Sequence, residues 1–300
     1  MKKLAAFTIL LVALIFGFGE LFRALALRFD PNEPKAVGVL QLKNEDYDIV
    51  FMGNSVAQQG INPAVIDRRL GSNSFNMAIG GGSLLENELM LRNYLKSNRK
   101  PELIVYGMFV NEKRWGDNLR PTFRYNFDKN VLEHYLENLS ESSSGQDLIK
   151  NLNLIPLYRY RTALEYALKF IIDPENRNYT YFKGFLRTTA NKKVPKKLPP
   201  HQAGINEESY RSFMDFTKSE GIATLIIELP NSQSFNEATT GRDAVLQIIR
   251  SKSDLGFISF NENVEQYSSE MWVGINHFNI KGADRFSEIL ANTLMGYYKK

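Results

Sequence analysis

Three loops and one histidine supply the groups in this sequence that could do chemistry. Gly53-Asn54-Ser55 follows an apolar run, so the Ser55 hydroxyl is expected where a buried strand turns into a helix, a position suited to a nucleophile. Gly80-Gly81-Gly82 follows a second run, and its backbone N–H groups can approach a reacting oxygen. Asn111 follows a third run and offers an amide donor. His277 precedes the last expected helix, where a base could reach the serine. Each piece alone is common turn chemistry, but their order after successive strands makes the set more specific.

The composition of the chain excludes several other kinds of chemistry. The chain has 300 residues, no cysteine and three histidines (His134, His201 and His277) that lie far apart in sequence. Disulfides, thiolate metal sites, cysteine nucleophiles and a His-x-x-x-His metal motif are therefore excluded. We expect no metal and no cofactor. The net charge is only +4, which is too small an excess to argue for a nucleic-acid partner.

The elements that must position these groups alternate along the chain. Asn62 followed by Pro63, Ser83 and Asn279 are each expected to begin a helix. Continuous apolar strands interleaved with helices predict a parallel sheet covered on both faces, with chemistry at the carboxyl ends of its strands. Strands are expected over residues 48–52, 74–79, 102–109, 222–229 and 257–260, and helices over 62–70, 83–97, 207–219, 244–251 and 279–298.

The N-terminus predicts a membrane location. Lys2 and Lys3 precede sixteen uncharged residues, 4–19, after which the apolar character continues to Arg28. This stretch is longer than a typical signal-peptide core and slightly short of a full span, which Glu20 and Arg23 near the headgroups would complete. We expect an uncleaved anchor over residues 1–28, with the N-terminus in the cytoplasm and the body exported to the periplasm or cell surface. A cleaved signal and a buried helix are the alternatives.

The stretch between the third and fourth expected strands interrupts the alternation. Residues 112–206 read as an insertion rich in Tyr and Phe, with helical pieces at 130–139 and 154–172 and a Ser-Gly loop at 142–145. Its later part is a basic run without an acidic residue, which indicates either a solvated loop or a surface for anionic glycans or lipid headgroups. The six basic residues are Lys183, Arg187, Lys192, Lys193, Lys196 and Lys197.

At these positions the sequence resembles the SGNH (GDSL-like) hydrolase superfamily. Gly53-Asn54-Ser55 is similar to its first block, with Asn54 where many members have Asp, and residues 76–81 are similar to its second. Residues 110–112 resemble the third block, and His277-Phe278-Asn279 followed by Gly282 resembles the last. The resemblance covers residues 46–112 and 221–298. It implies a flavodoxin-like three-layer α/β sandwich with a parallel sheet of about five strands over residues 29–300.

The resemblance also implies roles for individual residues. Ser55 would be the nucleophile and His277 its base, and the oxyanion hole would combine the N–H groups of Ser55 and Gly81 with the side chain of Asn111. The superfamily usually has Asp three residues before the histidine, and Gly274 stands at that position here. A backbone carbonyl, Glu270 or Glu228 could replace it, or the site could work as a dyad. A degenerate, non-catalytic site is the other interpretation.

The function implied is acyl transfer at the cell envelope. An anchored SGNH-like domain resembles bacterial proteins that assist acylation of cell-surface polysaccharides, some beside a membrane-bound O-acyltransferase. We therefore expect a serine esterase or O-acyltransferase that acts on ester groups of carbohydrate through an acyl-enzyme. The alternative is a degenerate glycan-binding or scaffold partner of a membrane-bound O-acyltransferase. Partners under either hypothesis are the membrane, acylated carbohydrate or another small ester, and that enzyme.

Overall fold

A computed structural model describes residues 2–29, 32–112, 168, 179–251 and 253–298 of the chain. The chain divides into two compact units, Met1–Leu40 with Gly116–Arg177, and Gln41–Trp115 with Asn178–Lys300. In the first unit the structure describes α1 (Lys2–Phe29) and α2 (Asn32–Leu40). Apart from Leu168, the helical pieces and Ser-Gly loop expected within 130–172 lie outside the described residues. The predicted boundaries at residues 28 and 112–206 stay predictions.

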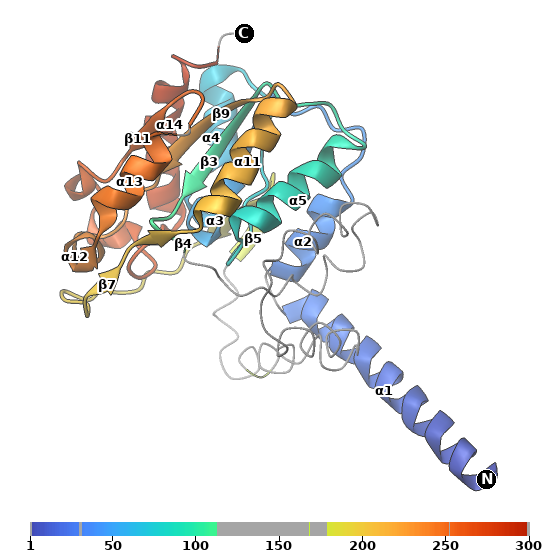
Figure 1. Ribbon diagram of the computed structural model, residues 1–300. Coiled ribbons are helices and arrows are strands. Elements are labelled where there is room, and N and C mark those ends of the chain that lie inside the picture. Colours follow the sequence, from blue (N-terminus) through green and yellow to red (C-terminus); the bar gives the residue numbers. More distant parts are fainter. Residues whose placement is uncertain (1, 30–31, 113–167, 169–178, 252, 299–300) are drawn as a thin grey trace. The chain divides into compact units, whose positions relative to one another are not determined.

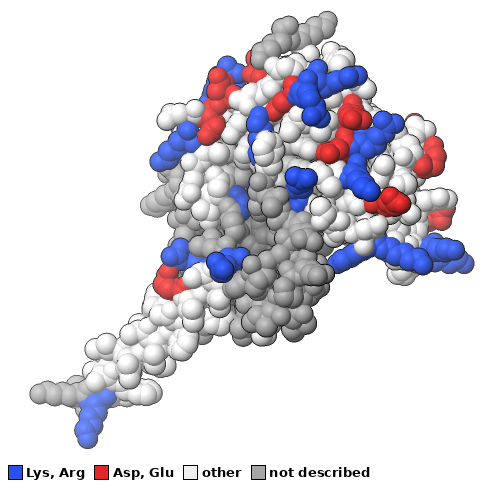
Figure 2. Space-filling model, turned by 180° about the vertical axis from the view of Figure 1, so that it is seen from behind, with Lys and Arg blue, Asp and Glu red and all other residues white. Residues whose placement is uncertain are grey.

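Helix α1 is apolar enough to cross a membrane. Its segment Lys3–Leu25 has 23 residues with a mean hydropathy of 2.3, and only 6% of the most apolar window is buried. At 1.5 Å per residue such a segment is about 34 Å long, against a hydrocarbon core of about 30 Å. Arg23 Nε donates to Glu20 Oε2 at 2.7 Å, so the two charges near the end of this segment compensate each other. The helix is consistent with a signal sequence or a single anchor, and Figure 2 shows its surface largely white between its ends.

The second unit contains a five-stranded parallel sheet (Figure 1). Its order is β11-β9-β3-β1-β2. From β1 the chain first adds β2 at one edge, then returns to the other side of β1 with β3, and continues through β9 to β11 at the opposite edge. This is the flavodoxin-like order, whose topological switch point lies between β1 and β3. The predicted α/β fold class is confirmed. The strands are β1 (Ile49–Gly53), β2 (Ser74–Asn76), β3 (Leu103–Met108), β9 (Ala223–Glu228) and β11 (Phe257–Ser259).

Helices cover both faces of this sheet, as Figure 1 shows. One face carries α5 (Leu84–Leu95), α11 (Glu207–Ser219) and α13 (Arg242–Arg250). The other carries α3 (Ser55–Gly60), α4 (Pro63–Leu70) and α14 (Ile280–Leu294). The expected caps are present: the side chains of Asn62, Ser83 and Asn279 accept from backbone N–H groups in the first turns of α4, α5 and α14.

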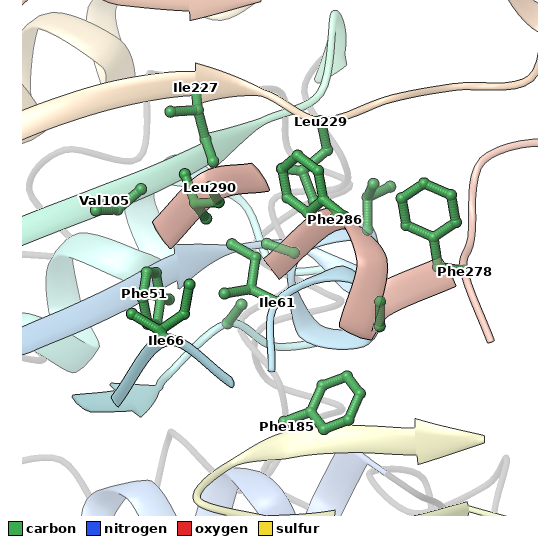
Figure 3. Packing of buried hydrophobic residues seen from close by; sticks show 14 of the residues in the cluster. Phe51, Ile61, Ile66, Val105, Phe185, Ile227, Leu229, Phe278, Phe286 and Leu290 are labelled. Carbon is green, nitrogen blue, oxygen red and sulfur yellow. The ribbon is translucent and has the colours of Figure 1, made fainter. Parts of the chain in front are cut away.

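The core lies mainly between the sheet and α14. Phe51, Val105 and Ile227 point from neighbouring strands toward Leu290 and Phe286 of α14 (Figure 3). All five of these side chains are at most 1% exposed. Strands buried on both faces explain why the sequence shows continuous apolar runs instead of alternation.

Smaller strands flank the sheet, and most of them come from the region read as an insertion. β5 (Tyr179–Phe182) and β6 (Phe185–Thr188) form a hairpin, and β4 (Asn111–Glu112) pairs with β8 (Gly204–Ile205). β7 (His201–Gln202) pairs with β10 (Thr239–Thr240), next to α12 (Gln233–Ala238). Lys183, in the hairpin turn, forms an ion pair with Asp67 at 2.6 Å. The basic run is therefore not one loop, and only its part from Lys192 to Lys197 is exposed chain outside the strands.

Candidate active site

The serine loop is built by β1 and the first turn of α3. Gly53 ends β1 with φ +135°, and a Cβ there would lie 2.5 Å from the Gly107 carbonyl oxygen, so this position requires glycine. The next residue, Asn54, caps α3, because its side chain accepts the N–H of the second helical residue at 2.9 Å. Ser55 is the first residue of that helix. The N–H of Gly53 donates to Asn87 Oδ1 at 3.0 Å, which ties the loop to α5.

The glycine loop after β2 lies against the serine loop. The N–H of Ile79 donates to the carbonyl of Gly53 at 3.1 Å. The buried Asn76 donates to the carbonyl of Ala57, within α3, at 3.0 Å and to that of Ile61, just after α3, at 2.9 Å. Gly81 has φ +68°, a conformation that favours glycine. Within the residues that the structure describes, neither the Ser55 nor the Gly81 N–H donates a hydrogen bond, so both remain open to a ligand oxygen.

The histidine loop is a short turn before α14. Trp272 and Phe278 form an antiparallel bridge, and the N–H of Val273 donates to the His277 carbonyl at 2.7 Å. The Ser232 N–H, in the loop after β9, donates to the Ile275 carbonyl at 2.9 Å. These backbone contacts hold the loop from both sides of the histidine.

Ser55 and His277 meet at the carboxyl edge of the sheet. Ser55 Oγ lies 2.8 Å from His277 Nε2, although the two residues are 222 positions apart in the sequence. Burial lowers the pKa of His277 to about 4, because an imidazolium loses solvation there. At neutral pH the ring is therefore uncharged and can accept the serine proton.

No carboxylate supports this histidine among the described residues. Gly274 has φ +91° and no side chain to offer. Glu228 and Glu270, both considered as substitutes from the sequence, bind elsewhere. Glu228 is buried and is held by Arg242, whose Nε donates to it at 2.9 Å, while Glu270 is exposed and lies 3.7 Å from Lys281 Nζ. Burial accounts for the lowered pKa of the histidine, which agrees with the lack of an acidic partner among the described residues.

The other candidate residues lie as follows. Asn111 is in β4, where its backbone pairs with Gly204 of β8, and its role in an oxyanion hole stays a prediction. His201 Nε2 lies 2.8 Å from Thr239 Oγ1, and its ring centroid is 4.5 Å from that of Phe235, so this histidine joins β7 to α12. His134 lies outside the described residues.

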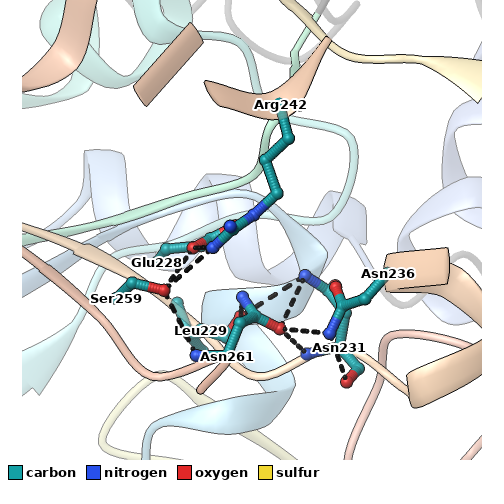
Figure 4. Close-up of polar contacts among 7 residues, drawn as sticks. All are labelled: Glu228, Leu229, Asn231, Asn236, Arg242, Ser259 and Asn261. Atoms are coloured by element: carbon teal, nitrogen blue, oxygen red, sulfur yellow. Dashed lines mark hydrogen bonds and ion pairs between the residues drawn. The ribbon is translucent and has the colours of Figure 1, made fainter. Parts of the chain in front are cut away.

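Sequence reasoning missed a polar network that joins the end of β9 and the loop after it to Ser259 and Asn261 (Figure 4). Asn261 Oδ1 accepts from the Asn231 N–H at 2.8 Å and from Asn236 Nδ2 at 3.0 Å, and Asn261 Nδ2 donates to the Leu229 carbonyl at 2.9 Å. Ser259 Oγ donates to Glu228 at 2.6 Å and continues the network to the sheet. Isolated asparagines at scattered positions give no sequence signal, because their partners are set only by the fold.

Fold and site together define a doubly wound α/β protein with a serine–histidine pair at its switch point. No family model matches the chain, and no curated protein matches it. Among solved structures it is similar to a crystal structure from Bacteroides fragilis described as a "putative acylhydrolase". The two chains share 10% sequence identity over 89% of this chain and 97% of that one, with a TM-score of 0.41. A likeness this distant concerns architecture and assigns this chain no activity.

Proposed function

We propose that this protein is an SGNH-like serine esterase or O-acyltransferase that works through an acyl-enzyme. The observation that carries the proposal is the 2.8 Å approach of Ser55 Oγ to a neutral His277 at the carboxyl edge of the sheet. Nucleophile and base within hydrogen-bond reach are the geometric requirement for this chemistry.

The reaction follows from the positions of these groups. Ser55 donates its proton to His277 Nε2 while its oxygen attacks the ester carbonyl carbon, and the carbonyl oxygen becomes an oxyanion. The N–H groups of Ser55 and Gly81, with the Asn111 amide, would donate to that oxyanion. His277 then protonates the leaving alcohol. In the second half, His277 takes the proton of water or of a sugar hydroxyl as that oxygen attacks the acyl carbon. The bond to Ser55 Oγ then breaks and the proton returns to Ser55, so the protein acts as a hydrolase or a transferase.

The setting proposed for this reaction is the cell envelope. The apolar α1 supports an anchored protein with its body outside the cytoplasm, and acyl groups on cell-surface carbohydrate are the ester class proposed as substrate.

A fluorophosphonate probe tests the proposal, because it reacts only with an activated serine. The full-length protein in detergent should be labelled at Ser55, as mapped by peptide mass spectrometry. Ser55→Ala should abolish labelling, and His277→Ala should slow it by at least about 10²-fold, the usual contribution of general base catalysis. A folded protein that neither labels nor hydrolyses p-nitrophenyl acetate would contradict the proposal.

A second function is favoured by one observation, the lack of an acidic partner for His277 among the described residues. Under that alternative the protein is an anchored, non-catalytic glycan-binding or scaffold partner of a membrane-bound O-acyltransferase. Measuring the acylation of cell-surface polysaccharide in cells distinguishes the two functions. Ser55→Ala would abolish the acylation that depends on this protein if it is an enzyme, and would leave that acylation unchanged if it is a scaffold.

A further inference from the structure

Four lysines lie on exposed chain between β6 and β7. The chain between these two strands has no acidic residue, and all four side chains are exposed. None of them forms an ion pair within the residues that the structure describes. We call this group the lysine strip, which consists of Lys192, Lys193, Lys196 and Lys197.

Apolar residues and prolines hold the backbone of the strip in place. Val194 and Leu198 alternate with the lysines, are half-buried and pack against the hydrophobic core. Pro195, Pro199 and Pro200 each fix one backbone dihedral, which reduces the entropy that the chain loses when it binds a partner. The lysine side chains therefore project into solvent from an ordered backbone.

The strip adjoins the histidine loop. The N–H of Lys192 donates to the Trp272 carbonyl at 3.3 Å, and Lys192 forms a parallel bridge with Val273. The N–H of Val273 in turn donates to the His277 carbonyl at 2.7 Å. A surface that the strip contacts would therefore lie close to the loop that carries His277.

The acidic groups near the strip do not cancel its charge. Glu237 and Glu265 line one groove together with Lys196. Glu270, in the segment before the histidine loop, lies 3.7 Å from Lys281 Nζ instead. Four ammonium groups thus stand against two carboxylates, so the local charge is positive. Exposed ammonium groups attract anions over about a Debye length, roughly 8–10 Å at ordinary salt.

The proposed anchor keeps a bilayer within reach of the strip. α1 ends at Phe29, and the α/β unit begins at Gln41. The chain between them spans at most about 40 Å, because a fully extended residue adds no more than about 3.6 Å. A tether this short gives the membrane surface a high effective concentration at the α/β unit. Lipid headgroups are therefore favoured over a soluble polyanion, which the small net charge attracts only weakly.

We propose that the lysine strip docks the α/β unit on a membrane surface that carries anionic phospholipids. The ammonium groups contact the headgroup phosphates, and each contact strengthens docking about 5-fold. Docking brings the histidine loop close to the bilayer. This inference goes beyond the proposed function, because it uses the anchor of α1 and requires no catalysis.

Lysine footprinting tests the docking. The full-length protein is reconstituted in nanodiscs of phosphatidylcholine alone, or of phosphatidylcholine and phosphatidylglycerol in equal parts. Its lysines are acetylated with acetic anhydride, an uncharged reagent, and peptide mass spectrometry gives the rate at each lysine. The strip should react at least about 5-fold more slowly in the anionic discs at low salt. This protection should be lost at about 1 M salt, where the Debye length is only about 3 Å.

Lys96 and Lys218 are the internal controls. Both are exposed and lie at the ends of α5 and α11, where the chain approaches the amino edge of the sheet, and their rates should be the same in both discs. Lys96→Gln with Lys218→Gln is the matched control variant and should leave the strip protected.

A double variant of the strip tests its own charges. Lys196→Gln with Lys197→Gln removes two of the four contacts, so the rates of Lys192 and Lys193 in the anionic discs should rise toward those in the neutral discs.

Three outcomes would overturn the proposal. Equal rates of the strip lysines in both discs would show that the strip does not contact the bilayer. Equal slowing of Lys96 and Lys218 would show a general effect of the anionic surface. Protection by polygalacturonate in neutral discs, and none by phosphatidylglycerol, would assign the strip to an anionic glycan. The readout needs no turnover, so failure of the docking surface is distinguishable from failure of the proposed function.

Discussion

At the scale of single residues, the unusual feature is a half-buried histidine that has no carboxylate partner among the described residues. An acid beside the distal ring nitrogen normally stabilises the imidazolium that forms during acyl transfer. Here burial lowers the pKa of His277 to about 4, and no described carboxylate opposes this shift. The neutral base is therefore abundant at pH 7, but each proton that it accepts costs more free energy. We infer that His277 can deprotonate Ser55 over a wide pH range, and that Ser55 nevertheless reacts slowly.

The pH dependence of labelling tests this description of His277. Only the neutral ring accepts the Ser55 proton, so the acid limb of the fluorophosphonate rate should have its midpoint near pH 4 instead of the ordinary value near 6.5. Because the folded-state pKa is the lower one, the stability due to neutral His277 is present above pH 6.5 and decreases as the pH falls toward 4. Circular dichroism measured at each pH distinguishes unfolding of the protein from titration of His277. A midpoint near 6.5 in folded protein would show that the ring is not desolvated.

Gly274 offers a second test at this scale. Its φ of +91° strains any side chain, so Gly274→Asp and Gly274→Ala should each cost about 1 kcal/mol and lower Tm by about 2–4 °C. Apart from its two chain neighbours, no atom of the described residues lies within 4 Å of a Cβ built there, so they leave room for the aspartate. Gly274→Asp should label faster than Gly274→Ala and move the acid limb upward, since a nearby carboxylate favours imidazolium. Equal rates and pH profiles in the two variants would mean that the aspartate does not reach His277.

At the scale of elements, the candidate site is assembled by asparagines that join neighbouring segments. Asn87 holds the serine loop from α5, and Asn76 holds α3 from the end of β2. Asn261 fixes the loop after β9, and that loop contacts the histidine loop through Ser232. Buried or half-buried amides that satisfy several backbone groups each give the loops one defined arrangement.

Removing the amide of Asn261 should loosen the histidine loop. Asn261→Ala removes the acceptor of the Asn231 N–H and the shorter of the two hydrogen bonds to the Leu229 carbonyl, which should cost about 1–3 kcal/mol and lower Tm. Fluorophosphonate labelling of the folded variant should also slow. Asn263→Ala, at an exposed position two residues on, is the matched control and should leave both unchanged. A normal labelling rate in destabilised Asn261→Ala would show that this network does not position His277.

Most elements of the sheet could be predicted from the sequence because their signals are local. The caps at Asn62, Ser83 and Asn279 and the apolar runs placed the main helices and strands within a few residues. The hairpin β5–β6 and the short β4, β7, β8 and β10 were missed. The two-residue strands among them exist only through partners far away in the chain. The resemblance in sequence named Ser55 and His277, but it could not show that Glu228 binds Arg242 instead of the histidine. Pairing of that kind depends on the packed fold.

At the scale of the whole molecule, the chain combines an exposed apolar helix with a globular α/β unit. Figure 2 shows Lys and Arg interspersed with Asp and Glu on the face that it presents. A net charge of +4 is small for a chain of this length, so long-range attraction of a polyanion is weak. Recognition by local polar groups is therefore the better expectation for this protein.

The last prediction concerns the side of the membrane on which the α/β unit lies. Lys2 and Lys3 begin α1, ahead of its uncharged residues, so the N-terminus should stay in the cytoplasm and the unit should be exported. Alkaline phosphatase fused after Lys300 should be active, because that enzyme requires an oxidising compartment. Leu11→Arg with Val12→Arg places two charges in the apolar segment, at about 2.5–3.5 kcal/mol each, and should abolish reporter activity. Leu4→Ala with Phe7→Ala is the matched control, since it changes two exposed apolar residues of α1 without adding charge.

The intact mass of the membrane-extracted protein separates the remaining alternatives, because an anchor retains residues 1–28 and a cleaved signal loses them. An inactive fusion in the unchanged sequence would contradict export, and with it the assignment of cell-surface carbohydrate as substrate.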